Sequence, residues 1–356
     1  MVTGEFISSR QDSIFSGKIT SIMPLNKSNI FILLVFATVL NGCFEKEEMI
    51  IPREINEIEI PYSLYEYQTY YRMEDEVLVS FNSYDSWDLG FECSEEGYGV
   101  ILNSSRYMHA GDAGTTDFYS VTSNTADTMI FDDSSGDMSK TALVGWVDLS
   151  DSQNPVFTGR VFIVDRGLME SGESFGYVKL VIEKLEGDVF YIRYANLDGS
   201  GETTFQVPKD PGVNFVLFSF ENGGSLAVQQ PPSSSWDLCF TKYSTIINDD
   251  YGVPTPYIVR GVLINNKAGV TAVLDSTLAY YDINLLSVPG YVFSDSQDAI
   301  GYEWKVYRDE AYTLIDGMNY IICDRNSNYF KIRFTDYFNK AGQRGYPAFE
   351  QIGLLE

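Results

Sequence analysis

The sequence is poor in the residues that build metal and nucleophilic sites. It contains one histidine, His109, in 356 residues. One histidine excludes a two-histidine zinc site and bis-histidine haem ligation within one chain, and a Ser-His-Asp or Cys-His centre would have to use His109. The four cysteines form no C-x-x-C pair, so a zinc ribbon, a thioredoxin motif and covalent c-type haem attachment are unsupported.

Positive charge is also scarce. The chain has 24 Lys and Arg against 50 Asp and Glu, a formal net charge of −26, which repels nucleic acid and anionic membrane surfaces. We therefore expect no nucleic-acid partner. With 44% hydrophobic and 21% charged residues the composition is that of a globular protein, and 15% aromatic residues favour strands.

Long hydrophobic runs are absent except for residues 30–40, IFILLVFATVL, which are too short to span a bilayer comfortably. A lysine precedes this run and Leu40-Asn41-Gly42-Cys43 follows it, an order that resembles a bacterial lipobox. We predict a signal peptide over residues 1–42, with Met23 as the true start, and a lipid on Cys43 as the only membrane anchor. A buried core helix is the alternative interpretation of the run.

The residues after Cys43 are charged and lack an apolar period. Residues 43–58, beginning Cys43-Phe44-Glu45-Lys46-Glu47-Glu48, predict a solvated acidic tether, and they resemble the export signal of some Bacteroidetes lipoproteins of the outer membrane's outer face. Cys93, Cys239 and Cys323 would then permit at most one internal disulfide.

An internal repeat covers nearly the whole of the predicted mature chain. The matched segments, in chain order, are Val77–Phe81 with Val216–Phe220, Ser86–Phe91 with Ser235–Phe240, Gly99–Asn103 with Gly261–Asn265, Asp165-Arg166 with Asp324-Arg325, and Tyr177–Leu180 with Tyr329–Ile332. Two prolines and a glycine interrupt the pattern near residue 208. We predict a tandem duplication, with one domain over 59–207 and a second over 208–356.

The matched segments have the two-residue period of half-buried strands. Trp87, Leu89 and Phe91 would share one face, as would Val178, Leu180 and Ile182, and then Phe330, Ile332 and Phe334. Glycine-rich turn clusters separate these segments, and no convincing helical stripe occurs. Each half therefore predicts an all-β, antiparallel, sandwich-like domain. The tryptophans of the two Trp-Asp-Leu segments, Trp87 and Trp236, would be buried, with Asp88 and Asp237 pointing outward.

Two motifs are better explained as loops than as sites. Gly172–Gly176 spells G-x-S-x-G, but a nucleophile elbow needs a following helix and a later histidine, and both are missing. Residues 132–137, DDSSGD, could offer oxygens to calcium, yet the spacing and closing glutamate of an EF-hand are absent, so we expect a solvated turn. We predict no catalytic residues.

The segment Arg106–Gly114 is different because it is glycine-rich, follows a strand, and places Met108 beside His109. Haem iron accepts imidazole and thioether ligands, so His109 or Met108, with Met129 or Met138 further on, could supply one or two axial bonds. An exposed loop with no ligand is the alternative.

The order of strands resembles the HmuY family of Bacteroidetes haem-binding lipoproteins. The similar segments are Phe215–Gly224 leading to Trp236–Phe240, Tyr329–Phe334 with Gly345–Glu350, and Gly114–Thr122. The resemblance implies two HmuY-like all-β domains, no enzymatic activity, haem capture at the cell surface for iron uptake, and delivery to a TonB-dependent receptor. Family members hold haem with two histidines or with methionines, and this chain cannot supply two histidines. Haem-ligand predictions therefore remain Met108, His109 and Met129, from local chemistry alone.

Two other functions fit the same composition. A glycan-binding surface lipoprotein would stack sugars on exposed Tyr or Trp, and a structural or adhesive surface protein would need no concave pocket.

Overall fold

Every strand pair in the structure is antiparallel, as the two-residue period predicts. The structure, a computed structural model, describes residues 57–227, 230–249 and 251–354. Within them the only helices are short 3-10 turns. The predicted all-β fold is thus confirmed. The predicted signal peptide, Met23, Cys43 and nearly all of the tether lie outside the described residues.

We call the continuous segment from β4 to β14 the first lobe. Its strands are β4 (Leu89–Glu92), β5 (Val100–Leu102), β6 (His109–Asp112), β7 (Val147–Asp148), β8 (Val156–Phe157), β9 (Phe162–Asp165), β10 (Tyr177–Glu186), β11 (Val189–Asn196), β12 (Thr203–Pro208), β13 (Phe215–Ser219) and β14 (Ser225–Leu226). They form one sheet in the order β12-β11-β10-β9-β6, a second in the order β14-β13-β4-β5, and the ribbon β7-β8.

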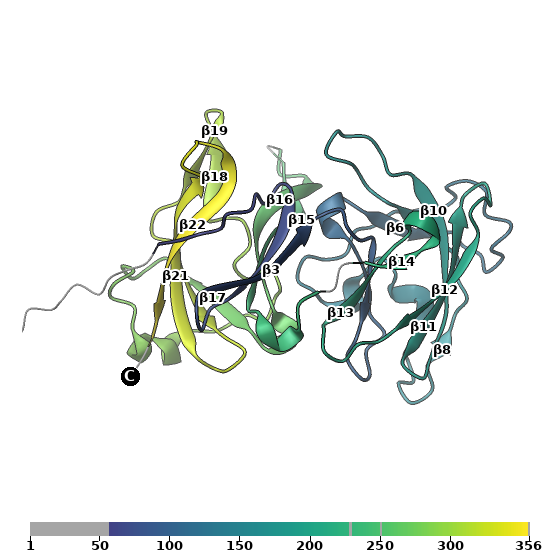
Figure 1. The fold of residues 1–356 in the computed structure, drawn as a ribbon, viewed down its shortest axis with the longest axis horizontal. Helices are drawn as coiled ribbons and strands as arrows, with labels where there is room; N and C mark the ends of the chain where they lie inside the picture. The colour runs from purple at the N-terminus through teal and green to yellow at the C-terminus, as the bar shows by residue number, and fades with distance from the viewer. Residues whose placement is uncertain (1–56, 228–229, 250, 355–356) are drawn as a thin grey trace, which may run out of the picture. The chain divides into compact units, whose positions relative to one another are not determined.

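The second lobe is built from the chain segments that precede and follow the first lobe in the sequence. Its strands are β1 (Glu57–Glu59), β2 (Tyr67–Arg72), β3 (Val77–Ser83), β15 (Leu238–Asn248), β16 (Pro254–Ile264), β17 (Thr271–Asp275), β18 (Lys305–Arg308), β19 (Ala311–Leu314), β20 (Asn319–Cys323), β21 (Tyr329–Phe338) and β22 (Arg344–Gly353). The sheets run β1-β22-β21-β20-β17 and β16-β15-β2-β3, with the ribbon β18-β19. In Figure 1 purple β3 accordingly belongs to the same sheet as green β15 and β16, to which β2 joins it.

Strand pairing crosses the predicted repeat boundary at residue 208. This boundary falls at the end of β12, before β13, yet β13 pairs with β4 of the first lobe, while β2 pairs with β15 of the second. The segments matched in sequence at 77 and 216 also occupy different places, since β3 lies at a sheet edge and β13 next to β4. The division of the chain into domains 59–207 and 208–356 stays a prediction, which rests on the sequence repeat.

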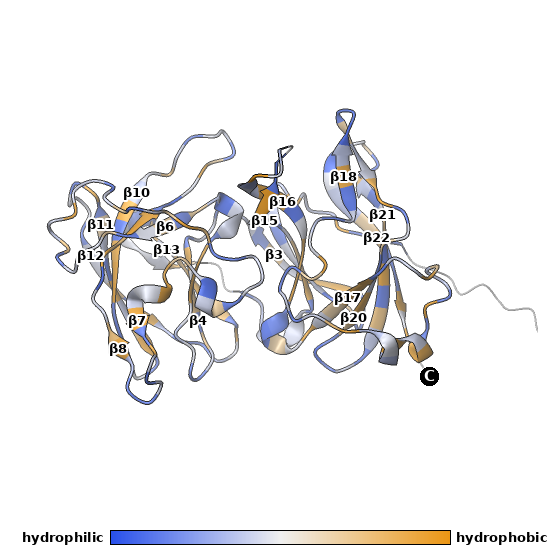
Figure 2. Cartoon of the chain, turned by 180° about the vertical axis from the view of Figure 1, so that it is seen from behind, coloured by the Kyte–Doolittle hydropathy of each residue, from blue (hydrophilic) through white to orange (hydrophobic). Residues whose placement is uncertain are grey.

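Each lobe has its own hydrophobic core between its two sheets. The alternating faces predicted for β10 and β21 are confirmed: Val178, Leu180 and Ile182 lie in the first core, and Phe330, Ile332 and Phe334 in the second. Burial of branched and aromatic side chains of this kind contributes roughly 1.5–3 kcal/mol per side chain. Figure 2 shows the same division, with orange segments on the strands and mostly blue connecting loops.

The two Trp-Asp pairs are both buried, so half of the prediction for them is wrong. Trp87 and Trp236 are buried as expected, but Asp88 and Asp237 are fully enclosed as well. Asp88 accepts hydrogen bonds from Arg106 and Arg166, and Asp237 from Arg325. The period also breaks at both tryptophans: Trp87 packs with Phe215 and Leu217, not with Leu89 and Phe91, and Trp236 packs with Tyr70 and Cys239.

Each aspartate can be buried because an arginine and a backbone N–H group donate hydrogen bonds to it, and the same arrangement occurs in both lobes. Asp88 also accepts from the backbone N–H of Phe220, and Asp237 accepts in the same way from Met73. Carboxylates that are enclosed in protein need such charged and N–H partners. Burial raises the pKa of Asp237, and the Met73 N–H and Arg325 lower it only in part.

Two further findings concern the described residues alone. None of their helices is long and apolar enough to cross a membrane. Cys93, Cys239 and Cys323 are free thiols, with the first two buried.

Candidate functional site

An open cavity of about 990 Å³ lies in the first lobe beside the β4–β5 connection. Its walls come from that connection, from the 3-10 turns η2 (Met138–Lys140) and η3 (Val144–Trp146), from β7, and from the connection between β8 and β9. The second lobe contributes Asn266 and Lys267, from the turn η6 (Asn266–Ala268). Ligand sites for small molecules are typically about 300–1,000 Å³, so the volume suits an organic ligand.

One side of the cavity is apolar and aromatic. Trp146 forms its buried base: its indole N–H donates to the carbonyl of Tyr98 at 2.9 Å, and its ring stacks on Phe157. Val144 and Leu149 line the same cavity and are 47% and 43% exposed. Exposed apolar side chains around a concave surface indicate a place where an apolar ligand surface can be buried.

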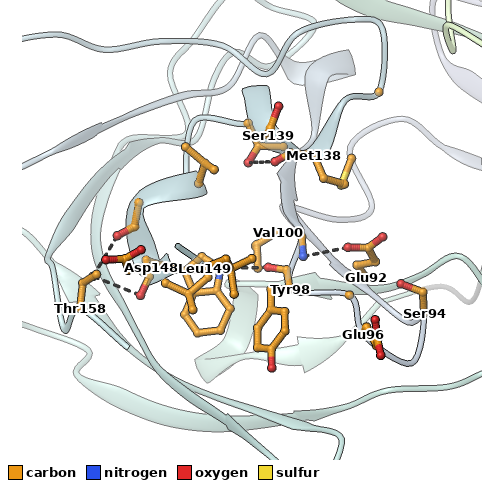
Figure 3. A pocket seen from close by; sticks show the side chains of 18 of the residues that line it. Glu92, Ser94, Glu96, Tyr98, Val100, Met138, Ser139, Asp148, Leu149 and Thr158 are labelled. Carbon is orange, nitrogen blue, oxygen red and sulfur yellow. Dashed lines mark hydrogen bonds between the residues drawn. The ribbon is translucent and has the colours of Figure 1, made fainter. Parts of the chain in front are cut away.

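Met138 brings a thioether to the cavity wall. Figure 3 shows Met138 and Ser139 on the opposite side of the space from Tyr98. The Met138 sulfur packs over Gly99, where an added Cβ would lie 2.6 Å from it. Gly99 therefore gives the side chain room to lie along the wall. A thioether so placed is a weak hydrogen-bond acceptor and a ligand for soft or borderline metal ions.

Glu92 and Lys267 form an ion pair that joins the two lobes at the cavity edge. Their Oε1 and Nζ atoms are 2.5 Å apart, and Glu92 also accepts from the N–H of Gly99 at 2.9 Å. Burial alone would raise the pKa of Glu92, but the Lys267 ammonium and the Gly99 N–H outweigh it, and the pKa lies below its ordinary value. The Glu92 carboxylate is therefore ionised at neutral pH.

The other charged groups of the cavity lie toward solvent. Arg160 is about half exposed and pairs with Asp112, while Glu96 and Asp148 are exposed carboxylates. Lys267 and Arg160 are the two cationic side chains among the lining residues. A ligand with an apolar body and anionic substituents could place its body on the aromatic wall and its substituents near these cations.

The residues predicted from sequence as haem ligands do not line this cavity. Met108 is 1% exposed and belongs to the core of the first lobe. His109, the next residue of the chain, faces the other way: its Nε2 lies 3.7 Å from Asp165 and its ring stacks on Phe131. The strand period thus separates Met108 from His109 instead of bringing them together.

Met129 lies on the same side of β6 as His109. Its sulfur packs over Gly111, where an added Cβ would lie 3.0 Å away, and it contacts the small cluster on that face of the sheet. His109 and Met129 are therefore on one face and Met108 on the other. Within the described residues no group of three or more His, Cys, Asp or Glu side chains could hold a metal ion.

Sequence reasoning named Met138 as an alternative ligand but missed the rest of the cavity. Tyr98 and Trp146 sit in segments without a motif, and Lys267 reaches Glu92 from 175 positions away. The usable signal was the matched pair Gly99–Asn103 and Gly261–Asn265, because Glu92 and Lys267 flank those segments in the chain.

A match to a family model agrees with the predicted family. Residues 256–350 match the model of the family described as HmuY protein. The apo HmuY analog of Tannerella forsythia is 11% identical, over 85% of this chain and 96% of that one, with a TM-score of 0.24. Apo PinO of Porphyromonas gingivitis is 15% identical, over 53% of this chain and 89% of that one, with a TM-score of 0.22. No curated protein matches the sequence.

The family match falls within the second lobe. It begins in β16 and ends in β22, and it includes the similar segments Tyr329–Phe334 and Gly345–Glu350. The similar segments at 114–122 and 215–240 lie outside it. The resemblance predicted from the sequence is thus confirmed by the match of residues 256–350 to the HmuY family model.

Proposed function

We propose that this chain is a non-enzymatic binding protein for haem or a related porphyrin, and that the cavity of the first lobe is the binding site. One observation carries the proposal: the Met138 thioether lines a cavity of about 990 Å³ whose opposite side is aromatic. A bound haem would supply an iron that accepts a thioether ligand.

The lining residues fit such a group in three respects. Met138 would hold the iron, and the ring of Tyr98 with the side chains of Val144 and Leu149 would cover the macrocycle. Lys267 would lie near a carboxylate of the porphyrin, since its ammonium is 28% exposed while paired with Glu92. The HmuY family match supports the ligand class.

The test is an absorbance titration of hemin into residues 44–356, which retain the compact unit Ile55–Glu356, under oxidising and reducing conditions. We expect a saturable Soret change at one equivalent, with affinity reduced about tenfold or more in Met138→Leu. Met129→Leu is the matched control and should bind as wild type does. Met108→Ala and His109→Ala test the ligands predicted from the sequence.

Three results are distinguishable. Loss of the Soret change in Met138→Leu alone supports the cavity. Loss in His109→Ala or Met129→Leu instead would overturn the cavity and place the ligand at β6, as the sequence predicts. A featureless titration of the wild type would overturn the haem proposal, and the glycan-binding or adhesive alternatives would take its place.

The cellular setting is part of the same proposal. With a lipid on Cys43 and the acidic tether after it, the protein would be held at the outer membrane, facing outward, and would deliver haem to a TonB-dependent receptor. Supporting this are the lipobox-like sequence around Cys43 and the family match.

A further inference from the structure

Residues 132–142, which we call the strap, form one wall of the cavity and are closed at their base. The two carboxylate oxygens of Asp132 accept from the N–H of Leu102 at 2.6 Å and from the N–H of Ala142 at 2.8 Å. The N–H of Asp133 donates to the carbonyl of Lys140 at 3.2 Å. Both ends of the strap are therefore tied together and to β5.

The tip of the strap sits on the second lobe. The hydroxyl of Ser134 donates to Asp298 at 2.6 Å and lies 2.9 Å from the hydroxyl of Thr245. The N–H of Gln297 donates to the carbonyl of Ser135 at 2.7 Å. Asp298 is itself fixed, because its other oxygen accepts from Ser296 at 2.5 Å.

Gly136 makes this close approach possible. Its φ is +77°, and an added Cβ would lie 3.0 Å from the side chain of Gln297 and 3.1 Å from that of Asn266. A side chain here would be strained and would push the strap away from the second lobe. Two residues later in the chain, Met138 turns into the cavity.

We infer that Ser134 and Asp298 are positioning residues for Met138, so that the second lobe sets the placement of the cavity's thioether. The argument has two parts. The strap is fixed at its base by Asp132 and at its tip by the hydrogen bond from Ser134 to Asp298. Met138 lies between the tip and Ala142, which Asp132 holds at the base, so its orientation depends on both attachments. The inference rests on the proposed function for its ligand, but the closure of the strap does not depend on any ligand.

The first measurement therefore uses no ligand. Hydrogen exchange followed by mass spectrometry would compare residues 132–142 in wild type, Ser134→Ala, Asp298→Asn and the rescue variant Ser134→Thr. A hydrogen bond to a carboxylate is among the stronger ones in proteins, so its loss should speed exchange in the strap about tenfold or more. Ser120→Ala is the matched control, because the Ser120 hydroxyl donates only within its own loop, to the Asp117 carbonyl.

The second measurement is the hemin titration of the same variants. We expect Ser134→Ala and Asp298→Asn to move the Soret band and to weaken binding about tenfold, with Ser134→Thr close to wild type. Unchanged hydrogen exchange in the strap of both variants would show that the hydrogen bond from Ser134 to Asp298 does not hold the strap. Faster exchange with an unchanged Soret band and affinity would overturn the positioning role.

Failure of the proposed function gives a different pattern. If the wild type binds no hemin, while exchange in the strap still accelerates in both variants, the role of Ser134 and Asp298 in holding the strap is supported and the haem proposal is not. A double variant of Ser134→Ala with Asp298→Asn should be no worse than either single variant, because the two residues share one hydrogen bond.

Discussion

Asp132 is a carboxylate held by backbone N–H groups, and this environment changes its acid strength. Burial raises the pKa of Asp132 to about 7, although the N–H groups of Ala142 and Leu102 lower it in part. Its ordinary value is 3.8, so the folded protein keeps this proton over a range in which the unfolded chain has lost it. Asp132 therefore contributes to the free energy of unfolding most fully at low pH. This contribution falls as the pH rises from about 4 toward 7.

We predict that Asp132→Ala destabilises the protein more at pH 5 than at pH 8. The variant leaves two N–H groups without an acceptor at any pH, which costs about 1–3 kcal/mol for each group that stays buried, but it also removes the desolvation of the ionised carboxylate. Urea unfolding of residues 44–356 at several pH values measures both effects. Asp133→Ala, at the exposed neighbouring aspartate, is the control. A difference from wild type that is constant or grows with pH would contradict the prediction.

The surroundings of a residue could be predicted from the sequence only where its hydrogen-bond partners are close to it in the chain. The acidic turn at 132–137 was expected, and its serines and aspartates do bond to nearby N–H groups. The backbone partners of Asp132 were not expected, because Leu102 lies thirty positions earlier in the chain. The same reason explains Asp88 and Asp237, whose partners Arg166 and Arg325 lie in the loops that follow the distant strands β9 and β20. Met138 was named, but its cavity depends on segments with no motif.

At the scale of elements, the strands follow from the sequence and their partners do not. Two-residue periodicity located β10 and β21 and the faces that they bury. The hairpins β2–β3 and β13–β14 begin the two halves of the predicted repeat, yet each completes a sheet of the other half. Similar local sequences fit either place, so the choice is made by the packing of the whole sheet.

This pairing predicts which fragment can fold. Residues 84–230 contain every strand of the first lobe, including β13, whose Phe218 pairs with Leu89 and lies in the core. Residues 59–207 lack β13 and leave Asp88 without the N–H of Phe220. We expect cooperative thermal unfolding and near-ultraviolet circular dichroism from 84–230, and neither from 59–207. Equal cooperativity of the two fragments would show that the sequence repeat, and not the strand pairing, defines the folding unit.

For the whole molecule, the proposed attachment to a membrane depends on one residue, Cys43, outside the described part of the chain. The net charge of −26 disfavours electrostatic binding to anionic lipid, and the first described strand begins at Glu57. The fourteen positions from Cys43 to Glu57 could extend about 50 Å at most. A lipidated chain would thus keep β1 within that reach of the bilayer.

We predict that Cys43→Ser transfers the protein from the membrane fraction to the soluble fraction of expressing cells. The physical reason is that acyl chains would supply the apolar contact with the bilayer. Cys323→Ser, which changes a thiol of the second lobe, is the matched control and should remain with the membrane. Retention of Cys43→Ser in the membrane fraction would mean that another part of the chain anchors it.

The placement of β1 and β2 beside strands from the far end of the chain has a consequence for the order of assembly. Synthesis delivers residues 57–83 first, but Tyr71 pairs with Leu238 and Glu57 with Glu350. The first lobe has all its strands once residue 226 has emerged, whereas the second must wait for almost the entire polypeptide. During this interval β2 and β3 have unpaired edges, which invite association with other chains. A chain that stops early in its last third would therefore hold every strand of the first lobe and an N-terminal hairpin whose partner strand β15 is incomplete.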